Sequence, residues 1–440
     1  MAKYKAYPEY KDSGVEWLGM VPSHWNIKRL GQFFEERRDK VSDKDYPPLS
    51  VTMQGIVPQI DTAAKTDAGD NRKLVLKNDF VINSRSDRKG SSGVSQLNGS
   101  VSLISIVMEP KRINPKFAHH LLRSYPFQEE FYRYGKGIVA DLWSTNSSEM
   151  KNILIPELAD DESNAIACFL DHETAKIDKL IEKQQQLIEL LKEKRQAVIS
   201  HAVTKGLNPD VPMKDSGVEW LGEVPEHWKL IKFSHCVSIR SGQVDPRKFP
   251  YCDYWLIAPN HIVSGEGRII NLETAKDQGA DSGKYLCRTG EVIYSKIRPA
   301  LVKACLSPSD TVLCSADMYP MTSYNGLTNN FLLLYLLSDV FTRFAVNQAD
   351  RVAMPKINRE SLSDCKIPVP PIDEQEKICS HAREALEKLD VLLQKSQLTI
   401  EIFQERRTAL ISAAVTGKID VRDWVAPDTQ DVEASQEATA

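Results

Sequence analysis

The segment KDSGVEWLGMVPSHW at residues 11–25 returns as KDSGVEWLGEVPEHW at residues 214–228. These two opening segments are identical at 13 of 15 positions, with an offset of 203 residues. Chance does not preserve a stretch of this length, so the chain contains an internal repeat, and a repeat constrains the architecture before any other pattern does. Most of the sequence between the copies differs, and the repeat must therefore serve something that both halves share.

A second pair of matching segments lies near the end of each half. The segment EKRQAVISHAVT (193–204) aligns with ERRTALISAAVT (405–416) at an offset of 212, with eight of twelve residues identical. The same offset continues backwards without a gap through 177–183 and 389–395. The sequence therefore predicts a tandem duplication of units of about 200 residues, each with a kept beginning, a diverged middle and a kept end.

The kept ends are predicted to be long amphipathic helices. Apolar residues recur at three- and four-residue steps with Lys and Glu between them, and no Gly or Pro occurs from 160 to 205. A long helix with one apolar stripe needs a partner, and its own duplicate is the most economical one, so we expect an antiparallel coiled coil about a pseudo-two-fold axis. The residues expected in the helix seam are Leu180, Leu187, Leu191, Val198, Leu392, Phe403 and Leu410.

The diverged middles contain short β-rich runs, such as 74–84 and 290–297, broken by Gly, Asn, Asp and Ser, with a helical patch in each. The predicted fold class is therefore α/β (mixed α+β), with two globular domains joined by two long paired helices. The expected divisions are 1–158 for the first domain, 159–206 for the first helix, 207–368 for the second domain, 369–419 for the second helix and 420–440 for an acidic, disordered tail.

Composition is that of an ordinary globular protein, with 42% hydrophobic and 26% charged residues. No run approaches the roughly 18 apolar residues of a membrane span, and the polar start lacks a secretory signal, so the protein is expected in the cytoplasm. The net charge is −4, but residues 420–440 carry six acids and one base, and removing that −5 leaves +1. A nearly neutral body neither supports nor excludes a DNA partner.

Catalytic and metal-binding signatures are missing from the sequence. The eight cysteines are scattered without a CxxC pair, so we expect reduced, packed thiols and no metal site. The sequence contains no GxxxxGK[ST] loop, no glycine-rich turn for a methyl donor and no GxSxG. We expect no catalytic residues, although a nuclease built from scattered carboxylates is an alternative that the sequence leaves open.

Binding is the remaining class of function, and one local similarity between the diverged middles points to it. KNDFVINSRSDRKGS (77–91) and RTGEVIYSKIRPALV (288–302) both run from a strand into a basic loop, which places Arg85 opposite Lys296. Cations, hydroxyls and amides reach base edges and phosphates in DNA, whereas an ordinary solvated loop is the alternative. The residues predicted to contact DNA are Asn83, Ser84, Arg85, Arg88, Lys89, Tyr294, Ser295, Lys296, Arg298 and Lys303.

The Trp and His residues of the opening segments are expected to be structural. Trp17, Trp25, Trp220 and Trp228, with His24 and His227, are spaced along the start of each domain. Aromatic residues in such positions usually pack between the domain and the helix behind it, and a partner-binding patch is the alternative.

The chain resembles the DNA-specificity subunits of type I restriction-modification systems. The resemblance lies in the GVEWLGxVPxHW opening, the segment IPVPPIDEQEKI (367–378), the helix end ERRTALISAAVTGKID (405–420) and the repetition of this layout. The first copy departs from the pattern, since PELADDESNAI (156–166) replaces PPIDEQEKI. This departure leaves open whether both halves make equal partner contacts.

The resemblance implies two target-recognition domains, each reading one half of a bipartite sequence in double-stranded DNA. It also implies that the kept helices bind two methylation subunits, which carry S-adenosylmethionine and methylate adenine at N6. A separate restriction subunit would use ATP and Mg to cleave, and this chain would bind no cofactor itself. Two alternatives remain: a symmetric scaffold that binds proteins, and a free-standing DNA enzyme.

Overall fold

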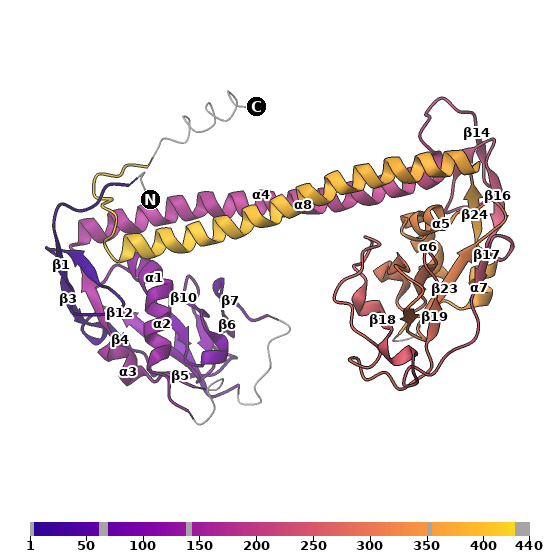
Figure 1. Ribbon diagram of the computed structural model, residues 1–440. Coiled ribbons are helices and arrows are strands. Elements are labelled where there is room, and N and C mark those ends of the chain that lie inside the picture. Colours follow the sequence, from indigo (N-terminus) through magenta and orange to yellow (C-terminus); the bar gives the residue numbers. More distant parts are fainter. Residues whose placement is uncertain (1–3, 61–68, 138–142, 350–353, 427–440) are drawn as a thin grey trace. The chain divides into compact units, whose positions relative to one another are not determined.

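The computed structural model describes residues 4–60, 69–137, 143–349 and 354–426. The chain divides into two compact units, and each takes helical segments from both halves of the sequence. Unit 1 contains residues 1–184 and 398–440, and unit 2 contains residues 185–397 (Figure 1). Each globular domain thus folds together with part of its own helix and part of the other copy's helix.

The globular domain of unit 1 is built on a four-stranded antiparallel sheet in the order β10-β9-β12-β4. A three-stranded sheet, β11-β8-β5, and the pairs β1–β2, β3–β13 and β6–β7 surround it. The strands are β1 Tyr10–Asp12, β2 Met20–Pro22, β3 Asn26–Arg29, β4 Phe34–Glu36, β5 Lys40–Val41, β6 Leu49–Thr52, β7 Gly55–Pro58, β8 Arg72–Val75, β9 Phe80–Asn83, β10 Ser92–Val94, β11 Gly99–Val101, β12 Ser105–Pro110 and β13 Leu154–Glu157. The short helices are α1 Pro115–Arg123, α2 Tyr125–Arg133 and α3 Ser147–Asn152.

Unit 2 repeats the four-stranded sheet as β21-β20-β23-β17, with the same order and the same antiparallel pairing. Its second sheet differs, because β18 and β22 pair in parallel. The strands are β14 Met213–Asp215, β15 Glu223–Pro225, β16 Lys229–Lys232, β17 Val237–Ile239, β18 Trp255–Ile257, β19 Tyr285–Cys287, β20 Val292–Ser295, β21 Ala304–Leu306, β22 Val312–Cys314, β23 Met318–Ser323 and β24 Lys366–Val369. The short helices are α5 Asn329–Leu336, α6 Asp339–Gln348 and α7 Arg359–Ser363.

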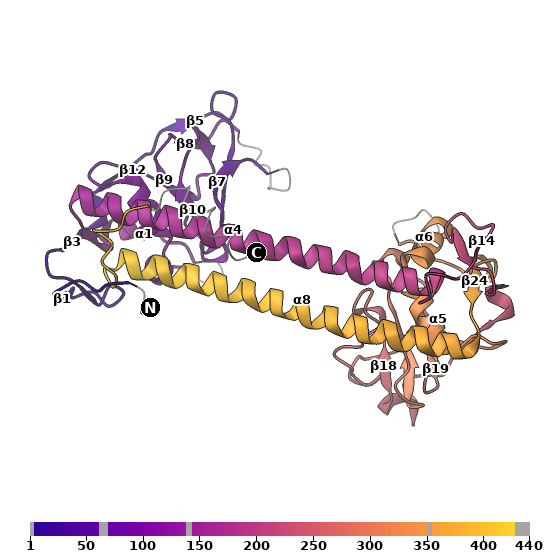
Figure 2. The same ribbon diagram turned by 90° about the horizontal axis from the view of Figure 1, so that it is seen from above.

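The two long helices are α4, Asp160–Lys205, and α8, Ile372–Val415. Both begin with acidic residues in the first turn, where the helix dipole favours negative charge. Within each unit they lie side by side and antiparallel (Figures 1 and 2). The ion pairs are Asp178–Arg407 in unit 1 and Asp390–Arg195 in unit 2. Asp390 and Arg407 each lie 212 residues after Asp178 and Arg195, so the two ion pairs are copies of one another.

The residues predicted for the helix seam divide into three groups by burial. Leu191 and Leu410 are buried, and Val198 and Phe403 are half-buried. Leu180, Leu187 and Leu392 are 44%, 41% and 47% exposed, which corrects their assignment to the seam. Ile177 and its repeat counterpart Leu389, which belong to the same predicted apolar stripes, are buried.

The opening segments connect each domain to the helices. Trp25 Nε1 donates to Glu162 Oε1 at 3.0 Å, and His24 Nε2 lies 2.8 Å from Glu162 Oε2, in the first turn of α4. The second copy repeats this arrangement with Trp228, His227 and Glu374 in the first turn of α8, at 3.1 and 2.8 Å. Both indole rings are almost fully buried, so the predicted packing of Trp25 and Trp228 is confirmed.

The same indole rings also pack against the end of the other helix. Gly417, just after α8, has a φ of +74°, and a Cβ atom there would lie 2.2 Å from Pro22 Cδ and 3.1 Å from Trp25. Gly206, just after α4, has a φ of +73°, and a Cβ atom there would lie 3.1 Å from Trp228 Cζ2. Each opening segment therefore holds the start of one helix and the end of the other, which explains why it is kept in both copies.

Residues at the start of the expected acidic tail belong to the folded part of unit 1. Asp420 N donates to Lys5 O at 2.8 Å, Val421 is buried, and the Arg422 guanidinium lies 5.0 Å from the centre of the Tyr7 ring. The boundary predicted at residue 420 is therefore too early. The remainder of the expected tail, 427–440, lies outside the described residues.

The PPIDEQ segment fixes an internal contact of unit 2. Gln375 is fully buried, and its side chain accepts from Thr328 N and Oγ1 and donates to Gly326 O and Pro370 O. Ser163 stands at the matching place in the first copy, and its hydroxyl bonds only within its own turn, to Asp160 O. In unit 1, the departure of the first copy from this motif therefore removes hydrogen bonds that in unit 2 join the globular domain to the start of α8.

Candidate nucleic-acid interface

The basic loop of unit 1 follows β9 and is ordered by hydrogen bonds. Asn83 Oδ1 accepts from Arg85 N at 3.1 Å, and Ser84 O accepts from Thr145 N at 2.9 Å. The Arg85, Arg88 and Lys89 side chains are 37%, 68% and 41% exposed. Lys89 pairs with Glu129 on α2. The loop therefore presents three part-exposed cations from a fixed backbone, and each pairs with a carboxylate, Arg85 and Arg88 with Asp87 and Lys89 with Glu129.

The corresponding loop of unit 2 has the same main-chain bonds, but the register differs by one residue from the predicted alignment. Lys296 O accepts from Ile357 N, as Ser84 O accepts from Thr145 N, and both pairs are related by an offset of 212. The counterpart of Arg85 is therefore Ile297, and Lys296 corresponds to Ser84. The predicted pairing of Arg85 with Lys296 is wrong because it aligned the cations and not the backbone.

A carboxylate just before each strand supports this register. In unit 1, Asp79 accepts two bonds from Arg37 and one from the Leu76 main chain. In unit 2, Glu291 accepts from Arg240 and from the Arg288 main chain. The predicted alignment places Asp79 opposite Gly290, whereas the offset of 212 places it opposite Glu291. Equivalent ion pairs thus fix equivalent strands.

Three of the residues predicted to bind DNA in unit 2 are either buried or hydrogen-bonded to main-chain oxygens. Tyr294 is 1% exposed and packs edge-on against Phe341, and Ser295 is 2% exposed. The Lys303 ammonium donates to the main-chain oxygens of Pro259 and Ile262, at 2.7 and 2.9 Å. Tyr294 and Ser295 are therefore corrected to core residues: all four residues of β20 are buried, because the domain packs against both faces of this strand.

Two half-buried cations of unit 2 lie beside Tyr319, and both also donate to main-chain oxygens, Lys296 to Ala316 O and Arg359 to Ile239 O and Arg240 O. Lys296 Nζ lies 5.5 Å and Arg359 Cζ lies 5.4 Å from the centre of this ring, within the range of cation–π attraction. Arg298 is exposed, with a φ of +47°, and its N–H donates to Pro355 O. Sequence reasoning missed Arg359. The matched helix caps Asn146 and Asn358, also 212 residues apart, were a signal that could have found it.

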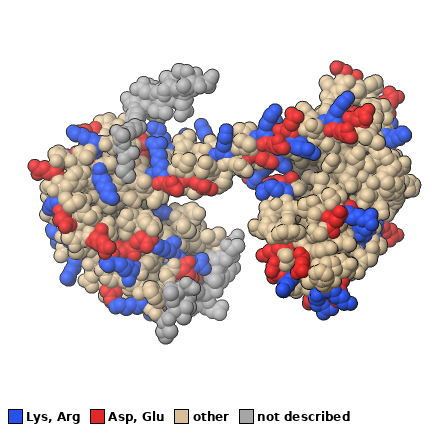
Figure 3. Space-filling view, viewed as in Figure 1, with Lys and Arg blue, Asp and Glu red and all other residues tan. Residues whose placement is uncertain are grey.

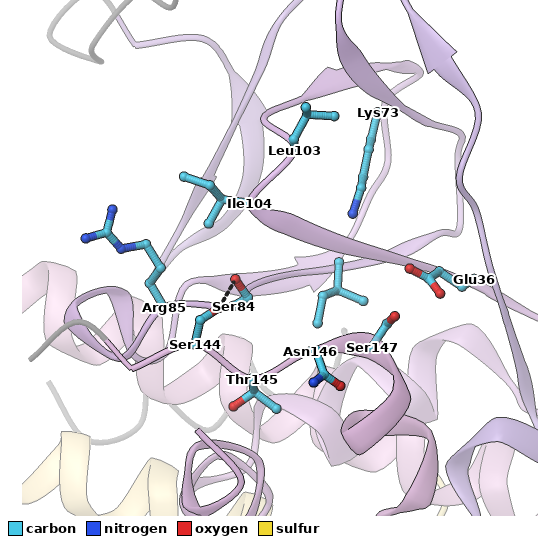
Figure 4. A pocket seen from close by; sticks show the side chains of 11 residues that line it. Glu36, Lys73, Ser84, Arg85, Leu103, Ile104, Ser144, Thr145, Asn146 and Ser147 are labelled. Atoms are coloured by element: carbon cyan, nitrogen blue, oxygen red, sulfur yellow. Dashed lines mark hydrogen bonds between the residues drawn. The ribbon is translucent and has the colours of Figure 1, made fainter. Parts of the chain in front are cut away.

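A cleft of about 480 Å³ opens beside Arg85 in unit 1 (Figure 4). It combines a carboxylate, two cations, hydroxyls, an amide and two exposed aliphatic side chains, which suits a mixed polar and apolar ligand surface. Only Ser84 and Arg85 of this lining were predicted from sequence. The lining residues are Glu36, Lys73, Ser84, Arg85, Leu103, Ile104, Ile106, Ser144, Thr145, Asn146 and Ser147.

Electrostatics inside the cleft keep its carboxylate charged. Burial acts to raise the pKa of Glu36, but hydrogen bonds with Arg38, Ser147 and Lys151 outweigh burial and lower the pKa. Burial lowers the pKa of Lys73, whose ammonium donates to Ser105 O at 2.7 Å. The cleft therefore offers both donors and acceptors, as reading the edge of a base requires.

Charge on the wider surface is mixed. On the face shown in Figure 3, Lys and Arg are interspersed with Asp and Glu over both units. Among the described residues, no cluster of three or more His, Cys, Asp or Glu could hold a metal ion, and no helix is apolar over a length that would cross a membrane.

The amino-acid sequence is similar to those of known proteins. Residues 228–402 match the family described as type I restriction modification DNA specificity domain. The chain is 25% identical to the type I restriction enzyme EcoDI specificity subunit of Escherichia coli, covering 96% of this chain and 94% of that one. It is 23% identical to the MjaVIII specificity subunit of Methanocaldococcus jannaschii, covering 92% and 95% of the two chains.

Two solved structures share the fold. One chain comes from work on the complex assembly and conformational transition of the type I R-M system, and it aligns with a TM-score of 0.63 at 15% identity over 91% of this chain and 99% of that one. The HsdS subunit from Thermoanaerobacter tengcongensis aligns with a TM-score of 0.50 at 16% identity over 91% and 98%. The similarity covers both halves of the duplication.

Proposed function

We propose that this chain, a relative of the type I restriction specificity subunits, gives a type I restriction-modification complex its DNA sequence specificity. The chain is a non-catalytic DNA-binding subunit. The observation that carries the proposal is the duplicated frame: matched ion pairs and matched Trp–Glu contacts hold two domains whose exposed loops differ. Two differing domains on one repeated frame suit a target with two different halves.

In each domain, the basic loop would supply the contacts to one half of the target. Arg85 has a forked guanidinium that is 37% exposed beside a cleft with donors and acceptors, a geometry suited to paired contacts with a guanine edge. Arg88 and Lys89 would neutralise phosphates. In unit 2, Lys296 and Arg298 would play these parts at neighbouring loop positions, with Asn83 and Ser84 supporting the loop of unit 1 from within.

Two methylation subunits would dock on the helices through two equivalent exposed patches. Unit 1 exposes Leu180 on α4 and Ile402 on α8, at 44% and 53%. Unit 2 exposes their repeat counterparts, Leu392 on α8 and Leu190 on α4, at 47% and 61%. Large apolar side chains at interfaces supply much of the binding energy. A patch that occurs twice by duplication fits a partner that binds twice.

Chemistry would reside on the partners. We propose that S-adenosylmethionine binds the methylation subunits, which modify adenine, and that ATP and Mg bind a separate restriction subunit that cleaves. This chain would bind double-stranded DNA and these subunits and no cofactor of its own. The alternative function is a protein-binding scaffold, which the mixed charge on the face shown in Figure 3 also fits.

The deciding experiment is selection of binding sites from randomised duplex DNA by the chain in complex with its methylation subunits. The proposal expects a bipartite sequence with a gap of fixed length. Replacing residues 234–368 with the matching domain of a relative should change one half of that sequence and leave the other half unchanged. A scaffold would enrich no sequence, and a self-sufficient enzyme would modify or cut DNA without partners.

A further inference from the structure

The hairpin β6–β7 presents one large apolar side chain at its tip. Met53 is 67% exposed, between Thr52 and Gly55, which pair across the hairpin. The base of the hairpin is anchored, because Leu49 is buried and Val51 and Ile56 pack against the same small core as Leu49. Thr52 Oγ1 donates to Gly55 O at 2.9 Å and closes the turn. Met53 is therefore held out on an ordered support.

A half-buried cation, Arg123, holds the tip of the hairpin by a hydrogen bond. The Arg123 guanidinium, at the end of α1, donates through Nη2 to the main-chain oxygen of Met53. Its Nη1 lies 2.9 Å from His119 Nε2, which can accept a hydrogen bond when the imidazole is neutral. Burial, and then the charge of Arg123, lowers the pKa of His119 to about 3, so this ring is neutral at physiological pH. The hydrogen bonds thus tie the hairpin tip to α1.

The tip lies directly beside the basic loop. A Cβ atom at Gly90 would come within 3.7 Å of Met53 Cε, so the methyl group of Met53 reaches the end of the loop that carries Arg85, Arg88 and Lys89. These cations are themselves 37%, 68% and 41% exposed. An exposed apolar side chain next to a loop that carries cations is an arrangement by which proteins insert a wedge between base pairs while the cations hold the phosphates.

We propose that Met53 is a wedge that enters the DNA at the first half of the target and kinks or unstacks one base step. This proposal rests on the DNA-reading function proposed above and adds a source of specificity: flexible pyrimidine–purine steps would be favoured at the insertion point without hydrogen bonds to their bases. Among its described residues, the domain of unit 2 has no two-stranded hairpin beside its basic loop. The distortion therefore belongs to one half of the target.

The test uses the complex with methylation subunits and the target obtained by selection, with 2-aminopurine placed in turn at each adenine of both halves. Apart from the adenines that the methylation subunits take out of the stack to modify, binding should raise the fluorescence at one further step, in the first half, because unstacking removes the quenching. Met53→Ala should abolish that signal and weaken binding about tenfold, or ~1.4 kcal/mol. Met53→Leu keeps an apolar wedge and should retain most of the signal.

Two matched variants separate the outcomes. Gln54→Ala changes the neighbouring residue of the same tip, and Phe249→Ala removes an apolar side chain of unit 2 that is 83% exposed; neither should change the signal in the first half. An unaltered signal in Met53→Ala would overturn the wedge while sequence-specific binding itself still stood. A loss of methylation-subunit binding without a change at the DNA would assign Met53 to a protein interface and equally overturn the proposal.

Discussion

The basic loops of the two units share a backbone and differ in their side chains. Ser84 and Lys296 accept the same main-chain hydrogen bond, yet the next residue is Arg85 in one loop and Ile297 in the other. The interior pairs Arg37–Asp79 and Arg240–Glu291 hardly changed. A buried ion pair needs both partners at once, since losing one leaves an uncompensated charge, whereas an exposed loop side chain can change alone. The buried ion pairs have therefore been kept in both copies, whereas the exposed side chains of the loops have diverged.

The contacts at the helix starts show a smaller difference of the same kind. Glu162 accepts from Trp25 and also from the Tyr7 hydroxyl at 2.7 Å, and its side chain is 5% exposed. Glu374 accepts from Trp228, and its side chain is 29% exposed. The residue 203 positions after Tyr7 is Asp210, which cannot fill the place of a buried phenol. At this carboxylate, unit 1 therefore has a buried hydrogen bond, from Tyr7, that unit 2 lacks, whereas unit 2 holds its helix start through Gln375.

The largest expected effect is a change in the DNA sequence that is bound. It tests whether the paired helices set the gap between the two half-sequences. Inserting one heptad after Lys183 and one after Lys395 preserves the apolar stripe and adds about 10.5 Å of helix. At ~3.4 Å per base pair, the gap between the two half-sequences should widen by about three base pairs. Site selection measures this directly. Unchanged spacing would mean that the helices do not act as a ruler.

Removing the carboxylate at a helix start should destabilise the units unequally. Glu162→Ala leaves the buried Trp25 and Tyr7 donors unpaired and should cost about 2–5 kcal/mol, whereas Glu374→Ala should cost about 1–3 kcal/mol. Hydrogen exchange in denaturant, read separately for peptides of each unit, measures both values. Glu162→Gln retains an acceptor and serves as the control. Equal losses in the two units would show that the Tyr7 contact contributes nothing.

The loop cations should affect one half of the target each. Arg85→Ala is expected to weaken binding by about 1–3 kcal/mol if it makes a paired contact to a base, and to relax selection only in the first half. Lys296→Ala and Arg298→Ala should act on the second half. Competition binding against targets mutated in either half measures the effect. Uniform losses on every sequence would reduce these residues to phosphate contacts.

The smallest expected effect is a dependence on pH confined to unit 1. A hydrogen bond from His120 lowers the pKa of Asp171 on α4, and this outweighs burial. Because the folded pKa lies below the unfolded value of about 3.9, the stabilisation is present above that pH and is lost as the pH falls further. Protection of α1 against hydrogen exchange should fall in acid, and Asp171→Asn should flatten the curve. The α5 helix of unit 2 should not show this titration.

Burial explains which site residues could be predicted. Strand β20 and its basic loop were recognisable from their residues, but Val-Ile-Tyr-Ser does not say that both faces of the strand are covered, and Tyr294 and Ser295 are both inside. The cleft beside Arg85 was not predictable, because Glu36, Lys73 and Asn146 come from separate segments that only folding brings together. Tyr319 and Arg359 join Lys296 for the same reason.

The sequence by itself determined the duplication, the long helices, the mixed α/β domains and the resemblance to a specificity subunit, because repeats, helical periodicity and short motifs are local patterns. Tertiary structure decided the register of the loops, the exposed positions of Leu180 and Leu392, and the contacts of Glu162 and Glu374. These depend on partners that are distant in the sequence, and a side chain's environment is set by what packs against it and not by its neighbours in the chain.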